Sequence, residues 1–299
     1  MKIKFSDYFK ISNIISILFF LVSILLISFK GLNYGIDFKG GTLFEVQIKD
    51  NNTNITTIRD SLNNLKIGDI NVKEFGKSGN FLIKVEKSEK ENNETVSLVK
   101  NTLNGVTNDI SFRRVENVGP KVSSELLKSG IISICLALLA MLFYIWVRFE
   151  WQFSLGSIVA LFHDVIITLG VFSLFSIEIN LSIVAAVLTI VGYSMNDTVV
   201  IYDRIRENLS KYNNVNIIEI SDISVNETLS RTLITSVTTL LALLSIFILG
   251  GSILKGFSFA MILGVLIGTY SSIFIASPIL KYLKVSSKTL EKKDEEILP

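Results

Sequence analysis

Six long apolar stretches constrain this chain more than any other feature of its sequence. A helix rises about 1.5 Å per residue, so about 20 apolar residues are needed to cross a hydrocarbon core of about 30 Å. Stretches of this kind lie at about residues 11–29, 130–147, 153–175, 179–201, 233–249 and 257–280. We therefore predict a polytopic α-helical membrane protein with six transmembrane helices.

Composition supports the membrane class and excludes others. The 299 residues are 49% hydrophobic and 19% charged, with a mean hydropathy of +0.51, which is more apolar surface than one soluble core can cover. The net charge of +2 is small and the basic residues flank apolar runs, so we expect no nucleic-acid partner. Cys135, the single cysteine, lies in an apolar run and is expected to pack there. We expect no metal and no cofactor.

The lysines and arginines of the short flanking segments predict the orientation. Most of these basic residues flank the spans on one side of the membrane, and the short connections on the other side contain only Lys255. The first apolar run is too long for a signal core, and no small-residue cleavage site follows it at residues 28–30, so we interpret it as an uncleaved anchor. We predict that both termini are cytoplasmic. The basic residues on that side are Lys2, Lys4, Lys10, Arg148, Arg204, Arg206, Lys211, Arg231, Lys281, Lys284 and Lys288.

The segment between the first two apolar stretches, residues 30–129, is predicted to be an exported, folded domain. Alternating apolar residues predict strands at 42–48, 70–75, 81–85 and 110–115, and helical spacing predicts helices at 55–65 and 94–103. This β-α-β-β-α-β order is the ferredoxin-like pattern, which the regular apolar strands favour over a solvated linker. Residues 87–93 are expected to form a loop. The predicted divisions are 1–29, 30–129, 130–284 and a cytoplasmic tail, 285–299.

Several polar residues lie inside the predicted membrane helices, where an ionisable group costs several kcal/mol unless it has a partner or a water-lined path. His163 and Asp164 lie in the third helix and Asn196 and Asp197 in the fourth. The fifth helix is expected to open with Arg231, followed by Thr235 and Thr239. Helical spacing gives each of these helices one polar side.

Asp197 and Arg231 are both expected within one or two turns of the cytoplasmic boundary, so they can meet. A buried aspartate facing an arginine would respond to a cation, because binding of a proton removes the attraction and frees the arginine to find other acceptors, such as Thr235 or Thr239. The alternatives are that Arg231 only snorkels to headgroups and that Asp197 is a satisfied packing residue. His163 is expected to be a supporting residue. In the sixth helix, Gly264, Gly268, Ser272 and Ala276 predict a packing stripe.

Five motifs then stand in order along the chain. They are GIDFKGGT at 35–42, VGP at 118–120, ALFHD at 160–164, GYSMNDT at 192–198 with DRIRE at 203–207, and LSRT at 229–232 with TS at 235–236. In this order and on this topology the sequence resembles the SecD/SecF family of bacterial protein translocase subunits, from Lys10 to about Lys284. The tail beyond Lys284 has no family signal.

The resemblance implies one half of a resistance-nodulation-division type transporter in the bacterial cytoplasmic (inner) membrane. The implied partners are SecD, the SecYEG channel, the translocating preprotein and the lipid bilayer. The family's ion-responsive pair falls on Asp197 and Arg231, so the implied function is to use the ion gradient, such as the proton motive force, for preprotein export. The glycines Gly35, Gly40 and Gly41, with Asp37 between them, are expected to have a structural role in a tight turn.

Two other functions are open to the sequence. An intramembrane aspartyl protease could use Asp164 and Asp197, but the Gly-x-Gly-Asp context is absent around both, and a nearby arginine would hold a carboxylate ionised. A small-molecule or lipid exporter of the same superfamily is the other. We expect a protein that is not an enzyme. Protons and sodium ions both remain possible as coupling ions.

Overall fold

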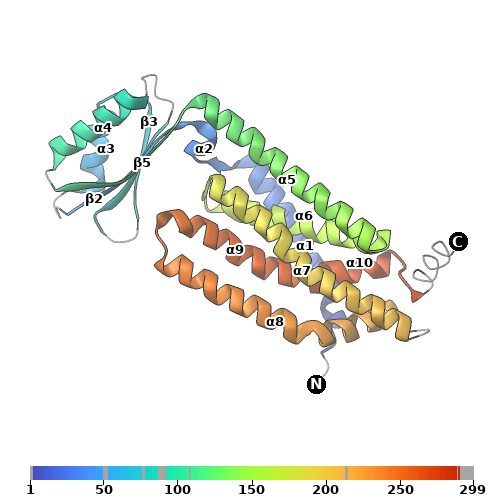
Figure 1. The fold of residues 1–299 in the computed structure, drawn as a ribbon. Coiled ribbons are helices and arrows are strands. Elements are labelled where there is room, and N and C mark those ends of the chain that lie inside the picture. Colours follow the sequence, from blue (N-terminus) through green and yellow to red (C-terminus); the bar gives the residue numbers. More distant parts are fainter. Residues whose placement is uncertain are drawn as a thin grey trace. The chain divides into compact units, whose positions relative to one another are not determined.

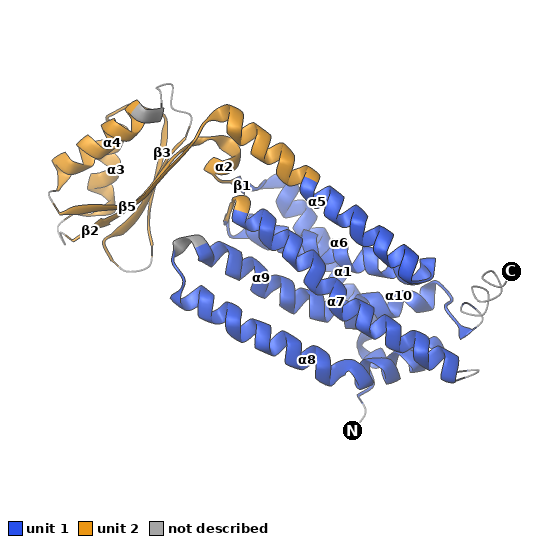
Figure 2. Cartoon of the chain, viewed as in Figure 1, with its two compact units in different colours: residues 1–33, 133–177, 182–299 blue, residues 34–132, 178–181 orange. Residues whose placement is uncertain are grey.

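The computed structural model describes residues 3–49, 53–75, 78–86, 92–107, 109–212, 215–287 and 289, with only the backbone described at 92, 93, 252 and 253. It divides into two compact units, shown in Figure 2. The helical unit comprises Met1–Asn33, Ser133–Ile177 and Ser182–Pro299, and the α+β unit comprises Tyr34–Ile132 and Glu178–Leu181. Most of the predicted loop at 87–93 and of the tail at 285–299 lies outside the described residues.

The helical unit contains the predicted membrane helices (Figure 1). In the described parts of the chain, six helices are long and apolar enough to cross a membrane, which confirms the predicted number. The last of them has three parts, because a π-helical turn interrupts it. The elements are η1 (Phe5–Tyr8), α1 (Phe9–Phe29), α5 (Pro120–Arg148), α6 (Trp151–Leu174), α7 (Leu181–Lys211), α8 (Ile217–Leu249), α9 (Ser252–Ser271), η2 (Ser272–Ala276) and α10 (Ser277–Tyr282).

Burial separates the central helices from the peripheral ones. In the most apolar part of each span, 56% of the residues are buried in α6 and in the sixth span and 50% in α7, against 17% in α1 and α8 and 11% in α5. Helix α6 packs on α1 and α9, and α9 packs on α8. Apolar side chains that remain exposed on α1, α5 and α8 are compatible with lipid, because hydrocarbon does not penalise them.

Helix α8 is longer than predicted, and this corrects the expected position of Arg231. The helix begins at Ile217, where the Asn216 side chain accepts a hydrogen bond from the Ile218 amide at 3.1 Å. Arg231 lies fourteen residues beyond that start, or about 21 Å along the helix, so it does not open the helix. Hydropathy detects only the apolar part of a helix, whereas residues 217–230 form an amphipathic first half that contains Asp222 and Glu227.

The α+β unit has the predicted ferredoxin-like fold. Its four-stranded sheet has the order β3-β4-β2-β5 with antiparallel neighbours throughout. The two longer helices, α3 and α4, contact each other and cover the sheet. The short helix α2 and the two-stranded pair β1-β6 were not predicted. The elements are β1 (Asn33–Tyr34), α2 (Ile36–Lys39), β2 (Gly41–Ile48), α3 (Ile55–Asn63), β3 (Asp69–Glu74), β4 (Asn80–Glu86), α4 (Asn92–Val106), β5 (Ile110–Val118) and β6 (Glu178–Ile179).

The core of this unit follows from strand alternation. Phe44, Val46 and Ile48 occupy alternate positions of β2 and are buried, since side chains two apart lie on the same face of a strand. They pack in one cluster with apolar residues of both helices, among them Ile58 of α3 and Val99 of α4. The alternation in the sequence therefore predicts both the strand and its buried face.

The predicted turn motif ties the start of the sheet to the start of a membrane helix. Gly40 and Gly41 have φ angles of +79° and +130°, which residues other than glycine rarely adopt. The Gly35 amide donates to the carbonyl of Ile179 at 2.8 Å, and Asp37 Oδ2 accepts from the Leu181 amide at 2.9 Å. Leu181 is the first residue of α7, so Asp37 satisfies one of the free amides of that helix start.

We predict that Gly41→Ala destabilises the sheet of the α+β unit. A Cβ at position 41 would lie 2.4 Å from the backbone oxygen of Val85 on the neighbouring strand, in addition to the strained φ, at a cost of about 1–3 kcal/mol. Hydrogen–deuterium exchange of the full chain should show faster exchange in β2 and β4. The control is Gly105→Ala in α4, where a Cβ meets nothing within 4 Å and exchange should not increase. Equal exchange in both variants would contradict the prediction.

Candidate functional site

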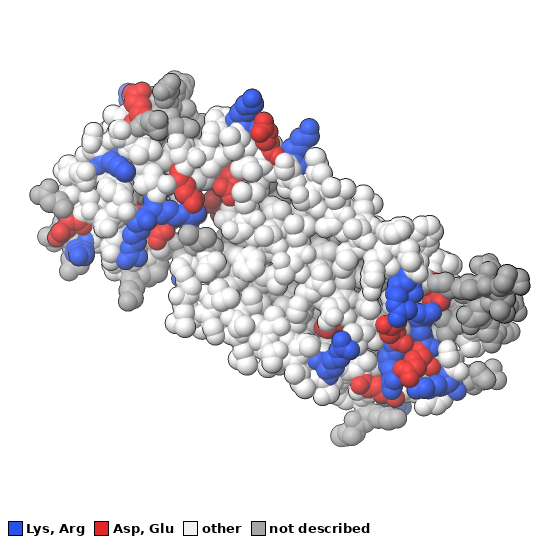
Figure 3. All heavy atoms as spheres, in the orientation of Figure 1, with Lys and Arg blue, Asp and Glu red and all other residues white. Residues whose placement is uncertain are grey.

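Charged side chains of the helical unit gather at the end where α7 finishes and α8 starts (Figure 3). Ion pairs join them there, including Arg148 to Asp203 at 3.1 Å and Arg204 to Glu227 at 2.6 Å. These pairs are partly or largely exposed, so they contribute little to stability. Asp164 and Asp197 lie away from this set, 0% and 2% exposed inside the bundle.

Asp164 is a carboxylate with three hydrogen-bond partners at the meeting point of three helices. Its Oδ2 accepts hydrogen bonds from Ser194 Oγ of α7 at 2.6 Å and from Ser271 Oγ of α9 at 2.7 Å. Its Oδ1 lies 2.9 Å from Nδ1 of His163, its neighbour on α6. Short hydrogen bonds to a charged acceptor are among the strong ones, and their loss would leave a buried charge without compensation. Asp164 therefore clamps α6, α7 and α9 together.

His163 has one bonded and one unbonded ring nitrogen. Because the Asp164 carboxylate is an acceptor, Nδ1 donates to it. Nε2 is buried and has no hydrogen-bond partner among the described residues. The ring stacks on Phe20 of α1, with centroids 6.5 Å apart and planes at 7°. His163 thus orients Asp164 and also packs α6 on α1.

Asp197 is buried at a similar level but is weakly bonded. Its Oδ2 accepts from Thr269 Oγ1 of α9 at 3.4 Å, and its Oδ1 accepts from Asn196 Nδ2 at 3.5 Å. Both distances are at the long limit of hydrogen bonding. Thr269 Oγ1 in turn lies 2.8 Å from Ser236 Oγ of α8, so hydroxyl groups connect α7, α9 and α8 at this level. A buried carboxylate with such weak partners can gain much from a cation.

Arg231 lies within electrostatic range of Asp197, but no ion pair within 4 Å joins these two described residues. The Arg231 side chain is exposed on the surface of the chain. Thr235, one turn further along α8, donates its hydroxyl to the backbone oxygens of Arg231 and Thr232 at 3.1 and 2.9 Å, and Thr239 is half-buried. The contact between Asp197 and Arg231 is not made in this conformation, and their pairing stays a prediction.

The polar residues of the sixth span were missed in the sequence. Its glycine stripe does permit close packing, since a Cβ on Gly268 would lie 3.0 Å from the Cβ of Ser194. That approach lets Thr269 reach Asp197 and Ser271 reach Asp164. Ser272, assigned to packing alone, also lies 2.8 Å from Thr198 Oγ1 of α7. The run of four hydroxyl-bearing residues at 269–272, in an otherwise apolar helix, was the sequence feature that could have indicated these contacts.

The arrangement suits ion exchange better than metal chemistry or hydrolysis. In the part of the chain that the structure describes, no three His, Cys, Asp or Glu side chains lie together as metal ligands would. Asp164 and Asp197 bind different hydroxyl groups, and no hydrogen bond joins their carboxyl groups. A shared proton between two carboxylates, which aspartyl proteases require, is therefore not formed in this conformation.

Comparisons with known proteins agree with this architecture. The model of the family "Protein export membrane protein SecD/SecF, C-terminal" matches residues 98–286, and that of the SecD/SecF GG motif matches residues 25–51. Protein translocase subunit SecF of Rickettsia bellii is 44% identical over 96% of this chain and 95% of that protein. The subunit of the same name from Cereibacter sphaeroides is 44% identical over 85% of this chain and 81% of that protein.

Solved structures give the same result. The crystal structure of SecDF from Thermus thermophilus, described as a translocon-associated membrane protein, superposes with a TM-score of 0.83 at 32% identity. The superposition covers 95% of this chain and 39% of the SecDF chain, so this chain spans less than half the length of that relative. With a family model that matches well over half of its residues and relatives of 44% identity along nearly its whole length, this chain belongs to the SecD/SecF family of protein export membrane proteins.

Proposed function

We propose that this chain is the SecF-type half of an ion-driven machine that promotes preprotein export across the bacterial cytoplasmic membrane. Relatives that align with almost all of it carry the name protein translocase subunit SecF. The SecDF relative contains a matching region within a chain more than twice as long, which supports a SecD-type partner for this chain. We propose further that the pair acts beside the SecYEG channel, and that the α+β unit holds or pulls the emerging preprotein.

The weak bonding of the buried Asp197 carboxylate carries the ion-driven part of the proposal. A carboxylate away from bulk water needs strong partners, and Asp197 has only two hydrogen bonds of 3.4 and 3.5 Å. Asp164 meets the same requirement with three bonds of 2.6, 2.7 and 2.9 Å. Asp197 is therefore free to exchange partners, whereas Asp164 is held in place. This difference favours Asp197 as the group that binds and releases the coupling ion.

The partner that Asp197 would exchange is Arg231. With Asp197 ionised, Arg231 turns inward from its exposed position and pairs with it, and a cation at Asp197 releases the arginine again. Because Thr269 and Ser236 connect Asp197 to α9 and α8, a change at this residue shifts the packing of those helices. An ion that crosses a potential of 100 mV supplies about 2.3 kcal/mol. A few ions therefore suffice to shift the equilibrium between two conformations. Protons and sodium ions both fit this scheme.

A hydrolytic role has less support. Asp164 and Asp197 have separate hydroxyl partners, and no hydrogen bond joins their carboxyl groups as a shared proton in an aspartyl protease would require. We therefore propose that the protein is a transport component and not an enzyme.

We predict that Asp197→Asn and Arg231→Met each abolish the stimulation of preprotein secretion by the ion gradient. The amide keeps the shape of the carboxyl group but neither binds a cation strongly nor attracts the arginine, and methionine lacks the charge. The measurement is secretion by inverted vesicles with and without a gradient, with proton and sodium gradients collapsed separately. Asp203→Asn is the matched control, since this exposed aspartate lies less than two turns from Asp197 on α7 and should leave the stimulation unchanged. Wild-type stimulation in both site variants would refute the switch.

We predict that Asp164→Asn lowers the stability of the chain, whereas Asp197→Asn changes it little. The amide would place a donor against one of the hydroxyl or ring donors that now bond to the carboxylate, at a cost of about 1–3 kcal/mol. Thermal unfolding of the purified full chain, followed by the fluorescence of Trp146 and Trp151, should show lower stability for this variant and little change for Asp197→Asn. Equal stability of the two variants would show that Asp164 is not a clamp.

We also propose that both termini face the cytoplasm, on the basis of the lysine and arginine bias. In a Cys135→Ser background, a cysteine in place of Thr57 on α3 should react with a membrane-impermeant maleimide in intact cells from which the outer membrane has been removed. A cysteine in place of Tyr212, just after α7, should react only after lysis. Both replaced side chains are exposed, so accessibility is controlled by the membrane alone. The reverse labelling pattern would invert the topology.

A further inference from the structure

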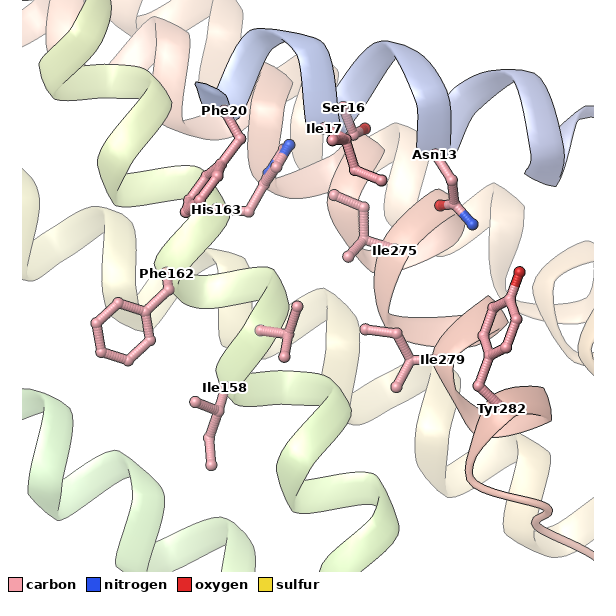
Figure 4. Close-up of a pocket in the computed structure, with 11 residues that line it drawn as sticks. Asn13, Ser16, Ile17, Phe20, Ile158, Phe162, His163, Ile275, Ile279 and Tyr282 are labelled. Carbon is pink, nitrogen blue, oxygen red and sulfur yellow. The ribbon is translucent and has the colours of Figure 1, made fainter. Parts of the chain in front are cut away.

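An apolar cavity of about 560 Å³ lies between α1, α6 and the end of the sixth span (Figure 4). Its walls are mainly aliphatic and aromatic, with Ile17 and Phe20 on α1 and Phe162 on α6 among them. Ile17 is 60% exposed and Phe162 is 47% exposed, so the cavity opens on the surface of a membrane-spanning bundle. Its volume is within the roughly 300–1,000 Å³ that ligand sites have.

The polar groups of the cavity are unevenly distributed. Figure 4 shows Asn13 and Tyr282 at one end of the cavity, away from Phe20 and His163. Lys10 is exposed on α1 one turn before Asn13, and Lys281 is exposed beside Tyr282. The described stretches at 5–10 and 277–284 contain these two lysines, Lys284 and one carboxylate, Asp7, and the Asp222 carboxylate of α8 is bonded to Ser6, so three lysines accompany two carboxylates. One end of an apolar cavity therefore has hydrogen-bonding groups and an excess of positive charge.

We propose that this cavity binds an acyl chain of an anionic phospholipid, with the headgroup at the Asn13–Tyr282 end. Water is a poor occupant, because a water molecule needs two to four polar partners and most of the lining offers none. An acyl chain makes dispersion contacts with every wall. The lysines attract the negatively charged phosphate. Lysine stems can extend along the apolar surface to reach it. This site does not depend on the proposed ion switch.

The lipid site would also contact the polar centre of the bundle. His163 forms part of the cavity wall, and its ring both stacks on Phe20 and bonds to Asp164. An acyl chain in the cavity covers the face that His163 contributes to the wall, and so protects the hydrogen bond that orients Asp164. Occupancy should therefore raise the thermal stability of the helical unit as well as leave a bound lipid.

The test is native mass spectrometry of the full chain in detergent, titrated with phosphatidylglycerol or phosphatidylcholine of identical acyl chains. We expect a several-fold preference for phosphatidylglycerol in the first bound lipid. Val159→Trp fills the cavity and should reduce that adduct several-fold. Val237→Trp is the matched control, since Val237 is similarly exposed on α8 and does not line the cavity. A second filling variant, Ile17→Trp, serves if the first is unstable.

The headgroup assignment has its own variant. Lys10→Gln combined with Lys281→Gln should remove the preference for phosphatidylglycerol while the weaker binding of phosphatidylcholine is unchanged. Wild-type adducts in both filling variants would overturn the site, and so would a cavity that retains only detergent at every lipid concentration. Equal binding of the two lipids by the wild-type chain would overturn the anionic headgroup. The effect on the bundle is tested by thermal unfolding with and without phosphatidylglycerol. Addition of this lipid should raise the stability of the wild-type chain but not that of Val159→Trp.

Discussion

The hydrogen bonds to the Asp164 carboxylate are the interaction on which the helical unit depends. A buried negative charge is costly unless hydrogen-bond donors surround it, and here α6, α7 and α9 each bring one to the same carboxylate. Ser194 and Ser271 have short side chains, so their helices must approach closely. Gly268 permits this approach, because it faces Ser194 without a side chain of its own. The bond network thus fixes the positions of the three most buried helices.

Asp197 shows that the same residue type in the same medium can be placed for a different role. Its carboxyl group is buried like that of Asp164 but has only distant partners, and Arg231 stays exposed nearby. A strongly bonded carboxylate resists change, whereas a weakly bonded one can bind and release an ion at little structural cost. Ser194, which donates to Asp164, and Asp197, which we propose as the exchangeable group, are one turn apart on α7.

Much of the fold could be predicted from the sequence, because the long apolar stretches of the membrane helices and the alternation of apolar residues in the strands are both clear. The apolar stretches gave the number of spans, and the alternation in β2 gave a strand with Phe44, Val46 and Ile48 on its buried face. The start of α8 could not be found in this way, since residues 217–230 are amphipathic and the apolar run begins only beyond them. The β1-β6 pair and the contact between Asp37 and Leu181 join segments about 144 residues apart in the chain, and no local pattern reports such a contact.

The sequence by itself determined the membrane class, the six spans, the ferredoxin-like domain and the family, and it identified Asp164, His163, Asp197 and Arg231 as the polar residues of interest. These follow from composition, periodicity and motif order, which are properties of the chain alone. Only the tertiary structure decided which carboxylate is held and which is weakly bonded, because the difference lies in the distances to hydroxyl groups of other helices, such as Ser271 and Thr269. The cavity beside His163 was likewise decided in three dimensions, since its walls come from helices that lie far apart in the sequence.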